Sequence, residues 1–188
     1  MKFKHGVKSY EIVEKLVNHV YPDGKLTILD LTFGVGRFYR KIRDRIRRLI
    51  AVDIAKYDFE VAPDELHLMD AYTFTNKVMN GELKIDKPDL IVIDPPWSQT
   101  KRGCLPRLTG ISHLPYHMRG VDISQIICAA IALSKHFKTP ILYRYKERLP
   151  YNHLVHAEAE VKIMGKTGII HYGVIVFSES QPEHQENS

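Results

Sequence analysis

The residues best suited to chemistry lie in two short segments of the chain, Asp30–Gly36 (Asp-Leu-Thr-Phe-Gly-Val-Gly) and Asp94–Trp97 (Asp-Pro-Pro-Trp). Each segment directly follows a short run of branched apolar residues, which is the pattern of a buried strand. Glycine has no Cβ atom, so a glycine-rich turn after a strand lets the backbone approach a ligand closely. We therefore expect a ligand at the first segment and reactive groups at the second.

The first segment does not match a nucleotide fingerprint. A dinucleotide motif would need a third glycine where this chain has Tyr39, and a Walker loop would need Gly-Lys-Ser/Thr, which the sequence lacks. S-adenosylmethionine (AdoMet) fits better, because it has no pyrophosphate and instead carries an amine, a carboxylate, a ribose diol and an adenine. Acidic residues at the ends of successive predicted strands suit those groups: Asp30 the ammonium, Asp53 the ribose hydroxyls and Asp70 the adenine amine. The alternative is that all three are turn aspartates at strand ends.

The second segment is suited to an aromatic amine, which is a poor nucleophile because its lone pair is delocalised into the ring. Asp94 and the Pro95 carbonyl offer two acceptors for the N–H groups, and Pro95 and Pro96 stiffen the turn without adding a competing donor. Trp97 offers a flat face on which an extruded base can stack, worth about 1–3 kcal/mol. The alternative is a structural turn with a core tryptophan.

The elements that must position these segments follow from hydrophobic periodicity. Helices are predicted over Ser9–Val20, over a face marked by Phe38, Ile42, Ile46 and Leu49, and over Tyr72–Met79 and Asp122–Phe137. Strands are predicted over Leu26–Leu31, Leu49–Asp53, Glu65–Met69, Asp89–Asp94 and Ile141–Tyr145, with a closing hairpin of Glu160–Met164 and Ile169–Phe177 turning at Gly165–Gly168. This alternation predicts an α/β fold with a doubly wound, mostly parallel sheet and an antiparallel C-terminal hairpin. Residues 1–177 are expected to form a single domain, and the polar residues 178–188 a disordered tail.

The two segments resemble the cofactor and catalytic motifs of class I amino-methyltransferases, which modify adenine N6 or cytosine N4 in DNA and adenosine in RNA. The opening Lys4–Glu11 is similar to the segment that precedes the first motif in that family, although Gly6 and Ser9 stand where the family has prolines. The resemblance covers about residues 4–97 and the strand pattern to Phe177, and it implies a Rossmann-like domain that binds AdoMet. It implies catalysis by Asp94, Pro95, Pro96 and Trp97, and cofactor binding by Lys8, Asp30, Thr32, Phe33, Gly34, Gly36, Asp53, Ile54, Asp70 and Ala71.

Charge favours a polyanionic substrate. The net charge is +5 and the sequence pI is about 9.1. The segment Pro95–Gly120 is predicted to be a long loop. Within Pro95–Val121, the basic residues Lys101, Arg102, Arg107 and Arg119 occur without an acidic one. This segment would clamp a phosphate backbone beside Trp97, unless it is simply a solvated loop. A second basic cluster, expected to be a solvated face or an ion-pair network, contains Arg37, Arg40, Lys41, Arg43, Arg45, Arg47 and Arg48.

The predicted function is therefore methyl transfer from AdoMet to an exocyclic amine of a nucleic-acid base, with adenine N6 in DNA or RNA preferred. The alternatives left open are guanine N2 in ribosomal or transfer RNA, a protein glutamine, and a non-catalytic nucleic-acid-binding subunit of the same fold. No segment is long enough for a target-recognition domain, so recognition would need the loop, a homodimer or a partner subunit.

Composition limits the other possibilities. No apolar run approaches twenty residues and the first ten residues are polar and basic, so neither a membrane span nor a secretory signal is expected, and the protein is expected in the cytoplasm. The two cysteines are expected to be ordinary thiols, and the histidine pairs at His113 and His153 lack the companions of a metal site.

Overall fold

The computed structural model describes residues 8–94, 123–145, 159–167 and 170–177. Several predictions fall elsewhere in the chain. Outside the described residues lie Pro95, Pro96, Trp97, Lys101, Arg102, Arg107, Arg119 and the tail 178–188.

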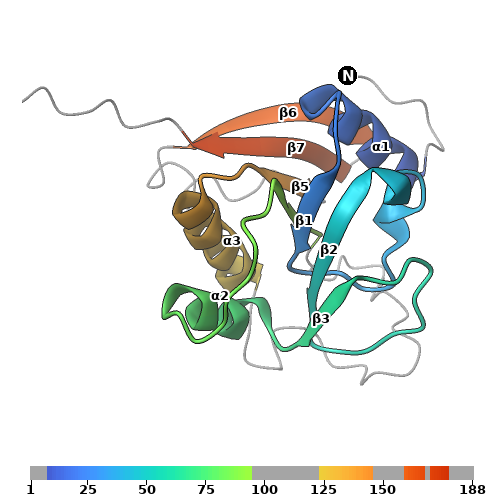
Figure 1. Cartoon of the computed structure of the whole chain (residues 1–188). Helices are drawn as coiled ribbons and strands as arrows, with labels where there is room; N and C mark the ends of the chain where they lie inside the picture. Colours follow the sequence, from blue (N-terminus) through green and yellow to red (C-terminus); the bar gives the residue numbers. More distant parts are fainter. Residues whose placement is uncertain (1–7, 95–122, 146–158, 168–169, 178–188) are drawn as a thin grey trace, which may run out of the picture.

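Seven strands form one mixed sheet in the order β3-β2-β1-β4-β5-β7-β6 (Figure 1). The parallel part contains β1 (Leu26–Asp30), β2 (Ile46–Asp53), β3 (Glu65–Leu68), β4 (Leu90–Ile93) and β5 (Ile141–Tyr145). The antiparallel end contains β6 (Ala159–Thr167) and β7 (Ile170–Phe177), with β7 paired to β5. The predicted doubly wound, mostly parallel sheet with an antiparallel C-terminal hairpin is confirmed.

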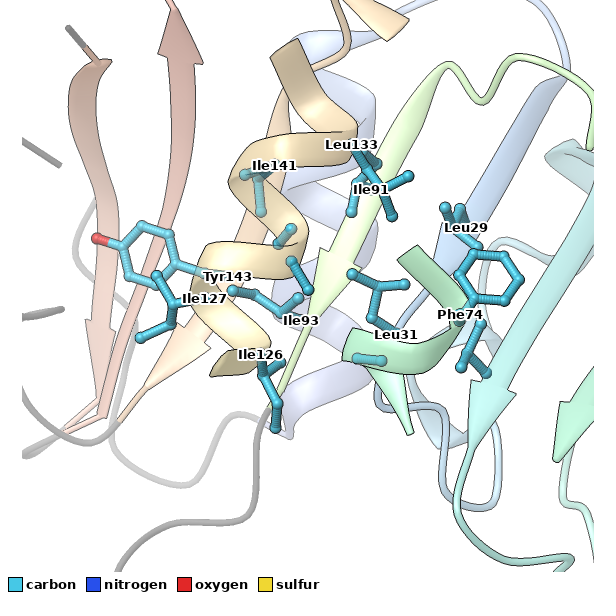
Figure 2. Close-up of a cluster of buried hydrophobic side chains, with 14 of the residues drawn as sticks. Leu29, Leu31, Phe74, Ile91, Ile93, Ile126, Ile127, Leu133, Ile141 and Tyr143 are labelled. Atoms are coloured by element: carbon cyan, nitrogen blue, oxygen red, sulfur yellow. The ribbon is translucent and has the colours of Figure 1, made fainter. Parts of the chain in front are cut away.

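Helices cover both faces of this sheet because its central strands are apolar on both sides. On one face, α2 (Ala71–Met79) and α3 (Ile123–Phe137) bury a cluster that includes Leu29, Phe74, Ile91 and Leu133 (Figure 2). On the other face, α1 (Ser9–Val20) packs over Ile28, Val92 and Leu142, which belong to the same strands. Alternate residues of β1, β4 and β5 thus point into opposite layers, as the pleat requires.

The helix predicted over Phe38–Leu49 is wrong. In its place are two single 3₁₀ turns, η1 (Arg37–Tyr39) and η2 (Arg43–Arg45), and β2 already begins at Ile46. Leu26 and Ile46 lie opposite each other at the start of the β1–β2 pairing, so the last four residues of the predicted helix belong to the sheet. The nine residues left between Gly36 and β2 form no α-helix, and they bury Phe38, Tyr39 and Ile42 from 3₁₀ turns instead.

The hairpin turn predicted at Gly165–Gly168 is also misplaced. Gly165, Lys166 and Thr167 continue β6 and pair with Tyr172, His171 and Ile170. A register shift between Ile163 and Gly165 accommodates the glycine inside the strand, which is a common position for a β-bulge.

The basic cluster after the glycine turn forms an ion-pair network, as one of its two predicted interpretations states. Arg37 and Arg40 both contact Glu60, Arg43 contacts Asp64, and Arg47 contacts Asp89. Arg48 contacts both Glu65 and Asp86. These positive charges are therefore matched within the fold and do not by themselves make a surface for nucleic acid.

The part of the chain that the structure describes contains no helix long and apolar enough to cross a membrane. Within the same residues, no group of three or more His, Cys, Asp or Glu side chains is arranged to hold a metal ion.

Candidate active site

The site lies between β1 and β4, where the order in which the chain adds strands to the sheet reverses. From β1 the chain proceeds outward to β2 and β3, and it then returns to place β4 and β5 on the other side of β1. In an open parallel sheet, the loops that leave the carboxyl ends of two such strands diverge and open a crevice between them. Asp30 ends β1 and Asp94 directly follows β4, so both predicted segments begin at this point.

The glycine turn after β1 is fixed by sheet and side-chain contacts. Phe33 N–H donates to the Val52 carbonyl at 3.3 Å, and Gly34 N–H donates to Asp53 Oδ2 at 2.8 Å. The other oxygen of Asp53 accepts from Ala55 N–H at 3.2 Å. The Asp53 carboxylate, predicted to bind ribose hydroxyls, therefore also ties the end of β2 to the turn.

Gly34 and Gly36 are glycines for different reasons. Both have a positive φ, +60° and +74°, which a side chain with a Cβ atom adopts at a cost. A Cβ atom on Gly36 would lie 2.3 Å from the Val61 carbonyl oxygen, so this glycine is enforced by packing. A Cβ atom on Gly34 would meet nothing within 4 Å, so the turn presents an open face there.

Asp30 lies beneath the turn and is only 2% exposed. Its Oδ1 accepts from Thr32 N–H at 2.8 Å, and its Oδ2 accepts from the buried Tyr39 hydroxyl at 2.6 Å. Burial raises the pKa of Asp30 to about 7; the bonds from Tyr39 and Thr32 oppose this rise, and the charges of Asp94 and Asp53 add to it. Burial, together with the adjacent Asp30, also raises the pKa of Tyr39 well above its ordinary value.

Thr32 connects the two predicted segments. Its hydroxyl accepts from Asp94 N–H at 2.6 Å and lies 3.4 Å from Asp30 Oδ1, to which it donates. The sheet adds a second link, because Leu31 N–H donates to the Val92 carbonyl at 3.0 Å. The first residue of Asp-Pro-Pro-Trp is thereby held against the glycine turn.

The remaining residues predicted to bind the cofactor are not part of the hydrogen-bonded path between Asp30 and Asp94. Phe33 is buried and stacks on Tyr39 with ring centroids 5.8 Å apart. Asp70, at the end of β3, is the N-cap of α2 and accepts from Thr73 N–H at 2.8 Å and from its hydroxyl at 2.7 Å, which is the turn role left open for it. Ala71 is buried behind Asp70, and Ile54 is half-buried after β2. Lys8 is exposed and caps α1.

One residue of the site was missed by the sequence analysis. Arg144 of β5 donates from Nη1 to Asp94 Oδ2 at 2.7 Å, and its guanidinium carbon lies 5.7 Å from the centre of the Phe38 ring. Ile93 pairs with Tyr143, so Asp94 and Arg144 follow as neighbours on adjacent strands. The available signal was a charged residue inside the apolar run Ile141–Tyr145, since a charge in a buried strand needs a partner.

A first prediction separates the two causes of glycine at Gly36. Gly36→Ala should lower the free energy of unfolding by at least about 3 kcal/mol, because it adds a backbone clash to the strain of a positive φ. The matched control is Gly24→Ala, whose φ is +83° with nothing within 4 Å, and which should cost about 1–2 kcal/mol. Urea unfolding of both variants measures the difference. Equal losses of stability in the two variants would show that the clash with the Val61 carbonyl oxygen adds nothing to the cost of a positive φ.

A second prediction concerns Asp30. The pKa of Asp30 is raised to about 7 in the folded chain, so its contribution to stability is fully present below the unfolded pKa of about 4 and is lost as the pH rises through 7. Asparagine cannot ionise, so the free energy of unfolding of Asp30→Asn should rise relative to that of the native chain as the pH increases. We expect this gain to grow from about 1 kcal/mol at pH 4.5 to about 4 kcal/mol at pH 8. Urea unfolding of both proteins at several pH values tests this. Parallel pH profiles would contradict it.

Comparisons with known proteins bear on the fold of the chain. No protein-family model and no curated protein sequence matches the chain. Solved structures resemble it over most of its length, among them three methyltransferases. A ribosomal protein L11 methylase from Lactobacillus delbrueckii subsp. bulgaricus aligns with a TM-score of 0.56 and 13% identity, covering 93% of this chain and 81% of its own.

The other two are N-methyltransferase NodS from Bradyrhizobium japonicum WM9 and magnesium protoporphyrin IX methyltransferase (ChlM) from Synechocystis PCC 6803 with bound SAM. NodS has a TM-score of 0.53 and 12% identity, covering 90% of this chain and 94% of its own. ChlM has a TM-score of 0.51 and 13% identity, covering 90% and 79%. At such identities the likeness concerns the fold, and the chain has the Rossmann-like fold of class I methyltransferases.

Proposed function

We propose that the chain is an AdoMet-dependent methyltransferase that acts on an exocyclic amine of a nucleic-acid base, adenine N6 in DNA or RNA. The observation that carries this proposal is the bond from Asp94 N–H to the Thr32 hydroxyl. It places the start of Asp-Pro-Pro-Trp against the glycine turn, at the switch point of the sheet. A methyl donor on the turn and an acceptor amine at Asp94 would then be neighbours, which methyl transfer requires.

The residues of the turn fit AdoMet. Gly34 leaves open space above the backbone, where a ligand can approach. Asp30, Asp53 and Asp94 lie close enough for the charges of the other two to act on Asp30, and such an acidic site suits a cofactor with an ammonium and a sulfonium group. Asp30 would act through its charge and by holding the turn, because both of its oxygens already accept hydrogen bonds.

The rest of the cofactor cradle is proposed from position. Asp53 would accept from the ribose hydroxyls at the end of β2 while it holds Gly34, since a carboxylate has about four lone-pair sites. Asp70 would face the adenine from the end of β3. Flanking contacts would come from Lys8, Thr32, Phe33, Gly36, Ile54 and Ala71.

AdoMet, when bound, supplies an activated methyl group, and the chain contributes alignment and electrostatics. The acceptor nitrogen would bond to the methyl carbon as the sulfur–carbon bond breaks, so that S-adenosylhomocysteine would leave and the extra N–H proton would pass to water. Asp94 and the Pro95 carbonyl would accept hydrogen bonds from that amine. Trp97 would stack on the base, and Lys101, Arg102, Arg107 and Arg119 would contact the phosphate backbone, with a second copy or a partner subunit completing recognition.

A third prediction tests the reaction. Methyl label from AdoMet should be transferred to unmethylated DNA or total RNA, and nucleoside analysis should find it in N6-methyladenine. Asp94→Asn should lower the rate by about 100-fold or more, because it removes an acceptor aligned with the amine. The matched control, Asp23→Asn, changes an exposed aspartate that precedes β1, at the opposite end of the strand, and should leave the rate unchanged.

Other outcomes of this assay name the competing functions. Label in N2-methylguanine or in protein glutamine would keep the cofactor and replace the acceptor. AdoMet binding with no transfer to DNA, RNA or protein would reject the catalytic proposal for the isolated chain and favour a non-catalytic subunit.

A fourth prediction uses Asp30 as a reporter of the ammonium group. A cation near Asp30 favours its ionised form, so binding should release a proton while the pH is below the pKa of about 7. AdoMet affinity should therefore rise several-fold from pH 6 to pH 8. Calorimetry in buffers with different ionisation enthalpies measures the released proton. Asp30→Asn should lose that proton release; the same release in native and variant proteins would argue against an ammonium at Asp30.

A further inference from the structure

The ion pair between Arg144 and Asp94 is not explained by the fold alone. Their side chains are 19% and 22% exposed, so both charged groups are largely removed from water. Removing such a pair from water is costly, and replacing it by apolar side chains often leaves a protein as stable or more so. A largely buried ion pair at the candidate site is therefore better explained by a role in the site than by stability.

Asp94 stands in an unfavourable electrostatic position without Arg144. It lies near Asp30 and contributes, with Asp53, to raising the pKa of that carboxyl. The same repulsion acts in return on Asp94, because like charges at one site disfavour ionisation of each other. A guanidinium 2.7 Å from Asp94 Oδ2 counteracts that repulsion.

Arg144 is itself held in place. It follows Tyr143 in β5, whose register against β4 is fixed by the pairing of Ile91 with Ile141 and of Ile93 with Tyr143. The centre of the Phe38 ring lies 5.7 Å from the guanidinium carbon of Arg144, and this contact limits the movement of the long arginine side chain. Asp94 is thus held twice, through its N–H by Thr32 and through its side chain by Arg144.

We propose that Arg144 is a positioning residue for methyl transfer, which keeps the Asp94 carboxylate ionised and oriented to accept from the acceptor amine. The inference rests on the proposed function. The bond from Nη1 to Oδ2 is compatible with it, because an ionised carboxylate offers about four lone-pair sites. Arg144 acts through Asp94 in this scheme and does not itself touch the reacting atoms.

The test compares Arg144→Lys, Arg144→Gln, Asp94→Asn and the double variant, each confirmed to be folded by urea unfolding. Arg144→Gln should lower kcat by about 10–100-fold and change the KM for AdoMet by less than about threefold, since it affects the acceptor side. Arg144→Lys keeps the charge and should recover a large part of that loss. In the Asp94→Asn background, Arg144→Gln should change kcat by less than about threefold, because residues that act through one another are not additive.

A matched control is Arg48→Gln. Arg48 lies on β2 and pairs with Glu65 and Asp86, so its replacement should leave kcat unchanged. Multiplicative losses in the double variant, or equal losses for Arg144→Lys and Arg144→Gln, would reject the positioning role. The lysine comparison decides the matter if Asp94→Asn falls below detection. If the native chain transfers methyl groups to no acceptor, the proposed function fails and this inference with it, whereas an active native chain with a multiplicative cycle rejects this inference alone.

Discussion

The hydrogen-bonded path from Asp94 through Thr32 to Asp30 is the interaction on which the site depends. Asp94 N–H donates to the Thr32 hydroxyl, which donates to Asp30, and the Tyr39 hydroxyl donates to the other oxygen of Asp30. Burying a neutral polar group without a hydrogen-bond partner costs roughly 2–7 kcal/mol. The oxygens of a buried carboxyl group therefore need hydrogen-bond donors. The chain satisfies that requirement with Thr32 of the turn and Tyr39 of η1. The Thr32 hydroxyl also accepts from Asp94, so the segment that follows β4 is linked to the same buried acid.

Charge is distributed unevenly over this path. Burial and its acidic neighbours raise the pKa of Asp30 to about 7, whereas Asp94 has the guanidinium of Arg144 beside it. The two aspartates therefore stand in different electrostatic surroundings, a pattern associated with divided roles in active sites. In our proposal, Asp30 shapes the cofactor turn and responds to its charge, and Asp94 receives the acceptor amine. The cost is a site in which like charges lie close together, which a fold selected for stability alone would avoid.

The fold permits this arrangement without dictating the reaction. Methyltransferases that share 12–13% identity with the chain have a similar fold, and the names of two of them refer to a ribosomal protein and a magnesium porphyrin. A shared sheet provides the switch point and the glycine turn, whereas the choice of acceptor depends on residues grafted onto the strand ends. In our proposal those residues are Asp94, which directly follows β4, and Arg144 of β5, and these two strands are adjacent in the sheet but far apart in the sequence. The case for an amine acceptor therefore rests on the site.

The sequence by itself determined the features that depend on neighbouring residues: the alternation of strands and helices, the glycine turn after β1, and acids at the ends of β1 and β2. Features that depend on distant segments were decided only by the tertiary structure. Helical spacing after Gly36 was overridden because β1 pairs with β2 from Ile46 onward. The N-cap role of Asp70, the burial of Asp30 and the bond between Asp30 and Tyr39 were all found only in the tertiary structure. Arg144 reaches Asp94 because parallel pairing aligns β4 with β5, and local periodicity contains no information about which strand lies beside which.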